Sequence, residues 1–209
     1  MARYTEALCR KCRREGTKLF LKGTRCTTNK CALERRNYAP GQHGKAKSKL
    51  SEYGTQLRAK QRTKIYYGVS ESQFRKYFEE AFRQQGVTSE VLFGLLERRL
   101  DNVAYRLGIG TSRAEARQLV NYAMLEVNNK VVNIPSYIVK VGDVIKVREA
   151  KKANKTIVQV LEATNSKAIP SWLEFNKETN EAKVLRIPTR EDVDLDVQES
   201  LIVELYSKN

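Results

Sequence analysis

Hydrophobic residues recur at helical spacing in the segment that follows the first 45 residues. Leu50, Tyr53 and Leu57 lie three and four positions apart, and basic side chains occupy the positions after them. This spacing predicts a basic amphipathic helix that ends near Gly68, because glycine is the usual residue after the last helical turn.

A second helix is predicted directly afterwards. The segment from Ser70 to Gln73 has the pattern of a capping box, in which the first side chain accepts a hydrogen bond from the backbone three residues later. The positions that follow repeat along one helix face and are predicted to be core: Phe74, Tyr77, Phe78, Ala81 and Phe82. Gly86 is expected to end this helix.

Two more helices are predicted before the pattern changes. One runs from about Ser89 to Leu107, with an inward face of Val91, Leu92, Leu95, Leu96, Leu100, Val103 and Leu107. A second capping box, from Ser112 to Glu115, begins a short helix with Leu119, Val120 and Met124 on one side. Arg113, Arg117 and Asn121 fall on one line of that helix, which is either a surface for nucleic-acid backbone or an ordinary solvated face.

From Leu125 onward the pattern favours strands. Residues 127–131 predict a hairpin turn at Asn128-Asn129, because asparagine tolerates positive φ. Residues 139–147 predict a strand pair that turns at Gly-Asp, and further strands are predicted at 156–161, 184–187 and 201–205. The chain is therefore expected to be α+β, with a helical part and a part that combines two short helices with β-hairpins.

The distribution of charge indicates which class of molecule the protein binds. Lys and Arg total 39 against 24 Asp and Glu, a net charge of +15, and residues 1–70 hold 18 of the basic residues with only 4 acidic ones. Such an excess favours a polyanionic partner, and the segment lacks the broad apolar face of a membrane-surface helix, so nucleic acid is favoured over membrane. The longest run without a charged residue is Val131 to Val139, which predicts no membrane span. The N-terminus lacks the apolar region of a secretory signal, so a cytoplasmic protein is expected.

Four cysteines lie close together: Cys9, Cys12, Cys26 and Cys31. Their spacing, C-x2-C-x13-C-x4-C, is typical of a closed, structural zinc site. A four-cysteine iron–sulfur cluster would use the same ligands, and disulfides or free thiols are the remaining alternatives. Neighbouring basic residues are expected to stabilise the thiolates and lower their pKa values.

His43 is the only histidine, and it lies in a Pro-Gly/His-Gly loop between basic residues. It is either a solvent-exposed loop residue or a nucleic-acid contact, and a single histidine disfavours histidine-dependent acid–base catalysis. The chain has no Walker, Rossmann, G-x-S-x-G or zinc-protease motif, so a non-enzymatic protein is expected. The acidic residues from 191 to 196 lack EF-hand spacing.

Several longer motifs resemble known sequences. Residues 99–108, 111–120, 127–131 and 141–145 resemble the S4 RNA-binding domain, although Asn-Tyr-Ala stands at 121–123 where a His-Gly pair is common, and Asn129 stands where glycine is usual. The flanks at 35–36, 40–44, 51–57, 60–61, 170–174 and 201–206 resemble the bacterial small-subunit ribosomal protein S4 family. The cysteines resemble those of its metal-binding subgroup.

The resemblance implies three parts: a metal-binding basic segment over 1–45, a helical domain over 46–97 that residues 166–209 rejoin, and an S4-type domain over 98–165. It implies binding to 16S rRNA early in assembly of the 5′ domain, contact with ribosomal protein S5, and an influence on translational accuracy. Repression of its own mRNA is a further family property. The rival hypotheses are an S4-domain RNA-modifying enzyme, which would need a separate catalytic domain, and a zinc-dependent regulator that binds duplex DNA.

Together, the charge pattern and the resemblance nominate one set of RNA contacts. They are Arg3, Arg10, Lys11, Arg13, Arg14, Arg35, Arg36, His43, Lys45, Lys47, Lys49, Tyr53, Arg58, Arg62, Arg106, Arg113, Arg117, Asn128, Asn129 and Lys130.

Overall fold

The computed structural model describes residues 4–46, 49–165, 167–176 and 179–207. The chain divides into two compact units, one formed by Met1–Leu92 with Leu195–Asn209 and the other by Phe93–Asp194. No helix in the described part of the chain is long and apolar enough to span a membrane.

The first unit is helical. Its elements are α1 (Leu8–Glu15), the 3-10 turn η1 (Gly23–Thr27), α2 (Ala32–Arg35), α3 (Glu52–Tyr67), α4 (Glu71–Arg83), the first half of α5 (Thr88–Glu97), and the C-terminal helix α10 (Ser200–Ser207). Residues 201–205, predicted as a strand, are therefore helical. The prediction is wrong because Ile202 and Leu205, three apart, are both buried, and α10 packs along α3.

Helix α3 ends where the sequence predicts, but it buries a different face. The Ser51 hydroxyl accepts a hydrogen bond from the Gly54 backbone at 3.1 Å, and Gly68 closes the helix with a φ of 64°. Leu50 and Tyr53 are 54% and 60% exposed, so the predicted apolar stripe is wrong. The buried positions of α3 are Gln56, Ala59, Thr63, Tyr66 and Tyr67.

Helix α4 follows its predicted capping box, and the Ser70 hydroxyl accepts a hydrogen bond from the Gln73 backbone. Phe74, Tyr77, Phe78 and Ala81 are buried as predicted, whereas Phe82 is 68% exposed. Tyr206 of α10 stacks on Phe78 with ring centroids 4.5 Å apart. The end of the chain therefore completes the core of the first unit.

The second unit combines helices with one antiparallel sheet. After the rest of α5 come α6 (Leu100–Arg106), α7 (Arg113–Asn121), β1 (Leu125–Val127), β2 (Lys130–Val131), β3 (Val144–Val147), α8 (Glu149–Lys152), α9 (Lys155–Thr164), β4 (Leu173–Asn176), β5 (Glu181–Val184) and the 3-10 turn η2 (Arg190–Asp192). The strand order is β2-β1-β3-β5-β4, and every pair is antiparallel. The single helix predicted from Ser89 to Leu107 is broken, because Arg99 is extended at φ −63° and ψ 135° and forms a bridge with Ile138.

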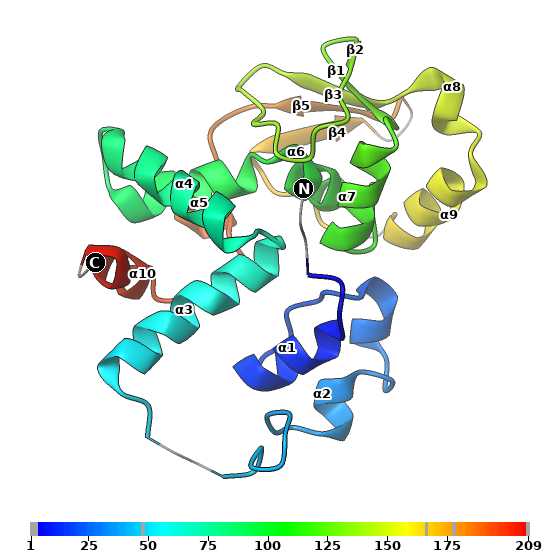
Figure 1. Cartoon of the computed structure of the whole chain (residues 1–209). Coiled ribbons are helices and arrows are strands. Elements are labelled where there is room, and N and C mark those ends of the chain that lie inside the picture. Colours follow the sequence, from blue (N-terminus) through cyan, green and yellow to red (C-terminus); the bar gives the residue numbers. More distant parts are fainter. Residues whose placement is uncertain (1–3, 47–48, 166, 177–178, 208–209) are drawn as a thin grey trace. The chain divides into compact units, whose positions relative to one another are not determined.

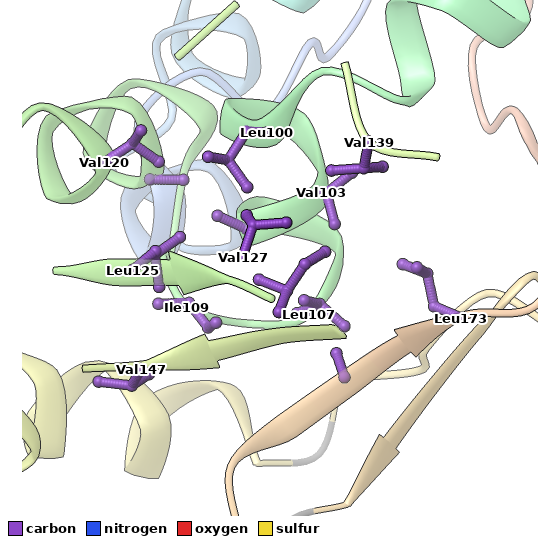
Figure 2. Packing of buried hydrophobic residues seen from close by; sticks show 14 of the residues in the cluster. Leu100, Val103, Leu107, Ile109, Val120, Leu125, Val127, Val139, Val147 and Leu173 are labelled. Atoms are coloured by element: carbon purple, nitrogen blue, oxygen red, sulfur yellow. The ribbon is translucent and has the colours of Figure 1, made fainter. Parts of the chain in front are cut away.

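One hydrophobic core joins the sheet to α6 and α7. Leu100 and Val103 of α6, and Leu107 directly after it, converge with Leu125 and Val127 of β1, as Figure 2 shows. Trp172 is fully buried in the same cluster. Removing this apolar surface from water is the main stabilising contribution, at about 25 cal/mol per Å².

Two predictions about this unit need correction. Residues 156–161 form part of helix α9 and not a strand, because the Asn154 side chain caps the helix at the Thr156 backbone and Ile157 and Val160 face the core. Strand β5 pairs with β3 and β4 pairs with β5, so the compact unit continues past residue 165, the predicted end of the S4-type domain, to Asp194. Strand β5 ends at Val184, so most of the strand predicted at 184–187 lies outside the sheet.

Candidate RNA interface

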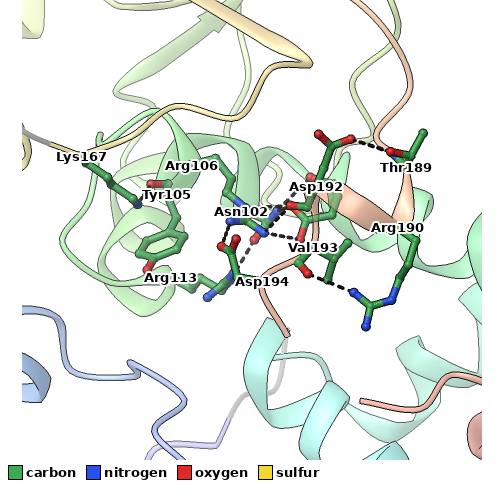
Figure 3. A network of polar contacts seen from close by, with 11 residues as sticks. Asn102, Tyr105, Arg106, Arg113, Lys167, Thr189, Arg190, Asp192, Val193 and Asp194 are labelled. Atoms are coloured by element: carbon green, nitrogen blue, oxygen red, sulfur yellow. Dashed lines mark hydrogen bonds and ion pairs between the residues drawn. The ribbon is translucent and has the colours of Figure 1, made fainter. Parts of the chain in front are cut away.

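A buried ionic network lies beside the core of the second unit (Figure 3). Arg106 of α6 donates to both carboxylate oxygens of Glu97, from Nη2 at 2.8 Å and from Nε at 3.0 Å. It also pairs with the Asp194 carboxylate and donates to the Asp192 carbonyl. Arg106 is only 4% exposed, so the structure uses it inside the protein.

Helix α7 contributes two more arginines to this interior. Arg117 Nη1 donates to Asp101 Oδ2 at 2.9 Å, and Arg99 Nη2 reaches the same oxygen at 2.6 Å. Arg113 Nε donates to Asn102 Oδ1 at 2.8 Å, and Arg113 is 7% exposed. The interpretation of Arg113 and Arg117 as residues that project from an exposed surface is therefore wrong.

The physical reason is that helical spacing defines a line on a helix but not the surroundings of that line. Position 113 directly follows the Ser112 cap and turns toward α6, where Asn102 and Asp101 supply acceptors. Sequence spacing alone could not have paired Arg113 with the Asn102 amide or Arg117 with the Asp101 carboxylate. The one available signal was Asp101 itself, an acidic residue between the core residues Leu100 and Val103.

Lys167 is a partly buried cation that the sequence analysis missed. Its ammonium lies 3.3 Å from the centroid of the Tyr105 ring, and Arg113 lies over the same ring at 4.4 Å. Burial lowers the pKa of Lys167 to about 7, and the charges of Arg113 and Arg106 lower it as well. The ring compensates only part of the cost of holding these cations close together.

The hairpin turn between β1 and β2 retains its predicted shape. Asn128 and Asn129 have φ values of 50° and 62°, so the turn uses two consecutive left-handed residues. Asn128 is fixed by its amide, which donates to Asp143 Oδ1 at 2.8 Å and accepts from the Val144 backbone at 2.9 Å. Asn128, Asn129 and Lys130 are exposed, and they remain available to a partner.

The cysteine segment opens the first unit. Cys9 and Cys12 lie on α1, Cys26 lies in η1, and Cys31 precedes α2. All four are free thiols, and Cys26 and Cys31 are buried. Among the residues that the structure describes, no group of three or more Cys, His, Asp or Glu side chains is placed to hold a metal ion. Burial raises the pKa of the Cys12 thiol, and the charges of the other three cysteines raise it further, so the expected lowering is wrong for Cys12.

Most of the basic residues predicted as RNA contacts in the first unit are accessible. Arg10, Arg14, Arg35, Arg36, His43, Lys45, Lys49 and Tyr53 are exposed, and Lys11, Arg13, Arg58 and Arg62 are partly buried. Arg13 donates to the Tyr38 carbonyl at 3.0 Å, while Arg58 and Arg62 face Glu15. Arg3 and Lys47 lie outside the described residues. The first unit thus presents a surface of exposed cations that can neutralise phosphates.

Comparison with known proteins identifies the class. The model of the ribosomal protein S4/S9 N-terminal domain matches residues 3–97, and the model of the S4 domain matches residues 98–145. These two modules define an RNA-binding ribosomal protein. The chain is 58% identical over 208 residues to small ribosomal subunit protein uS4 of Ruminiclostridium cellulolyticum and to that of Acetivibrio thermocellus, with 100% of each chain covered. The chain belongs to the uS4 family of small ribosomal subunit proteins, and this confirms the expectation of a non-enzymatic protein.

Proposed function

We propose that this chain is a structural component of the small ribosomal subunit in the cytoplasm, where it binds 16S rRNA and supports assembly of the 5′ domain. The carrying observation is identity of 58% over the full length of relatives named small ribosomal subunit protein uS4. The exposed cations of the first unit support the same role, because phosphate contacts provide much of the affinity of RNA-binding proteins. Ribosomal protein S5, other small-subunit proteins and the chain's own mRNA are proposed as further partners, with a contribution to translational accuracy.

A filter-binding assay tests the proposal. The full chain is titrated against fragments of 16S rRNA and against duplex DNA of matched length at several salt concentrations. Tight binding to the 5′-domain fragment and weak binding to the DNA are expected, with affinity falling steeply as salt rises. Equal binding to both nucleic acids would favour a regulator of duplex DNA and overturn the proposal.

The exposed pair Arg35 and Arg36 provides a more local test. Replacing both with alanine should lower the slope of log affinity against log salt by about two, since each lost phosphate contact removes roughly one unit. Lys155 and Lys183, which are exposed in the second unit, provide a control that removes the same charge. An equal decrease in slope for the two variants would show that the arginine pair has no particular role.

We also propose that Cys9, Cys12, Cys26 and Cys31 hold one structural Zn²⁺, with an iron–sulfur cluster as the alternative. Two observations support it. Cys9 and Cys12 both lie on α1, three residues apart, and the charges of Cys9, Cys26 and Cys31 all act on Cys12. The Lys22 backbone donates to Cys26 Sγ at 3.4 Å, and the Leu19 backbone donates to Cys12, which are hydrogen bonds suited to thiolates. Four cysteines would complete the coordination of zinc and leave no position open for catalysis.

Elemental analysis of purified full-length protein tests the metal. About one equivalent of zinc is expected, and it should be lost when Cys26 and Cys31 are both replaced by serine. A chelator should reduce the helical circular dichroism while leaving the fluorescence of Trp172, which lies in the other unit, unchanged. Less than half an equivalent of zinc and of iron would contradict the proposal.

A further inference from the structure

A single buried carboxylate lies where α1 meets α3. The Glu15 side chain, at the C-terminal end of α1, is 1% exposed. Arg58 Nη1 donates to Glu15 Oε1 at 3.0 Å, and Arg62 Nη2 donates to the Glu15 backbone carbonyl at 3.4 Å. Arg58 and Arg62 are four residues apart on α3, so both guanidinium groups lie on the same helix face above Glu15.

The cations around this carboxylate outnumber it. Arg58 and Arg62 both face Glu15; burial raises the pKa of this carboxyl, and the charges of the two arginines act against that effect. A salt bridge that served only stability would need one cation, and further cations repel one another without another anion. The site therefore has positive charge that Glu15 does not neutralise.

The two arginines also keep donors for another ligand. Their side chains are 27% and 26% exposed, so part of each guanidinium reaches solvent. A guanidinium has five N–H donors, and the contacts of Arg58 and Arg62 with Glu15 and the Asp196 carbonyl use only some of them. Arg62 Nε and Glu15 Oε2 are buried, lie 3.9 Å apart, and have no hydrogen-bond partner. Arg58 and Arg62 therefore retain N–H donors that an anionic ligand can use.

We infer that Arg58 and Arg62 form a binding site for RNA backbone phosphate, in which Glu15 is a positioning residue that orients the two guanidinium groups. The inference rests on the proposed function and adds a location and an internal support to it. Guanidinium groups bind phosphate oxygens through paired, charge-assisted hydrogen bonds, and these depend on the orientation of the planar group. A-form RNA presents its backbone rather than its major-groove base edges, which makes phosphate the expected ligand.

The variant Glu15→Gln separates this inference from simple electrostatics, because the two predict opposite results. The substitution keeps the shape of the side chain and adds one unit of positive charge to the protein. If charge alone mattered, binding to the 5′-domain RNA would become tighter. If Glu15 positions the arginines, the affinity should fall about tenfold, and the salt slope should decrease by about one.

Glu34→Gln is the matched control. Glu34 lies in the same segment, pairs with Lys18 at the surface, and its side chain is 54% exposed. It undergoes the same change in charge without contact to α3, so its affinity should stay equal or rise slightly. Binding of Glu15→Gln as tight as that of Glu34→Gln would overturn the inference.

If Glu15→Gln loses helical circular dichroism, a second variant, Arg58→Lys, tests the proposed phosphate site. Arg58→Lys preserves the charge and the exposed position on α3 but removes the planar fork, and it should weaken binding several-fold at an unchanged melting temperature. Parent-like affinity for Arg58→Lys would refute the site. These results are separate from the proposed function, because that function fails only if the parent chain itself does not bind ribosomal RNA.

Discussion

The substitution Arg106→Met examines whether the arginines of the second unit act inside the protein. Arg106 was predicted to contact RNA, yet its side chain is 5% exposed and the Glu97 side chain is 0% exposed. Methionine has a similar length and no charge, so the variant removes two hydrogen bonds to Glu97 and leaves a buried carboxylate without its countercharge. Breaking a buried ion pair in this way costs about 3–5 kcal/mol.

Urea unfolding followed by Trp172 fluorescence measures this cost. Trp172 is the only tryptophan, is fully buried, and belongs to the same unit as Arg106, so its signal reports on that unit. With an ordinary m-value of about 1–3 kcal/mol per M, the midpoint should fall by about 2 M. The full chain is used, so that the surroundings of Asp194 remain unchanged.

Two further variants complete the comparison. Arg148→Met removes a 40% exposed arginine whose carboxylate neighbour, Glu126, lies 4.0 Å away, and it should cost less than about 1 kcal/mol. Replacing Glu97 and Arg106 together with methionine should be less harmful than Arg106→Met alone, since no buried unpaired charge remains and the Asp194 side chain is 71% exposed. A loss for Arg106→Met as small as that for Arg148→Met would refute the reasoning.

Three other predictions follow from the same structure. Because the pKa of Lys167 is about 7 in the folded chain, the unfolded chain binds more protons than the folded chain above that pH. The parent should therefore gain stability relative to Lys167→Met between about pH 7 and about pH 9. A constant difference between their urea midpoints over this range would contradict the prediction. Burial alone would raise the pKa of Glu71, but hydrogen bonds from Lys60 and Lys64 hold it at about 2. The stabilising effect of the Glu71 carboxylate is therefore present above the ordinary pKa of 4.5 and is lost as the pH falls toward 2. Glu71→Gln should make the helical circular dichroism less sensitive to acid over that range. Asn129→Val should destabilise the second unit by about 1–2 kcal/mol because its φ is 62°, whereas Asn129→Gly should be tolerated, and equal urea midpoints for the two variants would exclude a backbone cause.

Features encoded by neighbouring residues could be predicted from the sequence. The serine caps at Ser70 and Ser112 and the turn at Asn128-Asn129 all depend on contacts within a few residues, and all are confirmed. The segments at 156–161 and 201–205 were misassigned because short runs rich in Val, Ile and Leu fit a strand or a buried helix equally well. Their conformation is decided by packing against elements distant in the sequence.

The candidate RNA interface, like the fold, could be predicted only in part from the sequence. Positive charge in the first 70 residues indicated a polyanionic partner without any knowledge of the fold. The division of arginines into interior and exterior could not be predicted, because it depends on acidic residues elsewhere in the chain. Arg117 is held by Asp101, and Arg58 by Glu15, across 16 and 43 positions of the sequence. Charge counts treat these arginines alike, although their surroundings give them different roles.

The placement of α10 has a consequence for the order of events during synthesis. The first unit needs Leu195–Asn209 to close, and Gln56 of α3 donates to Glu204 at 3.0 Å across 148 residues. The second unit is one continuous stretch, and its last strand, β5, ends at Val184, before any residue of α10. The second unit can therefore form without any later part of the chain, whereas the basic first unit, although most of it is made earlier, lacks its closing helix until α10 has been synthesised.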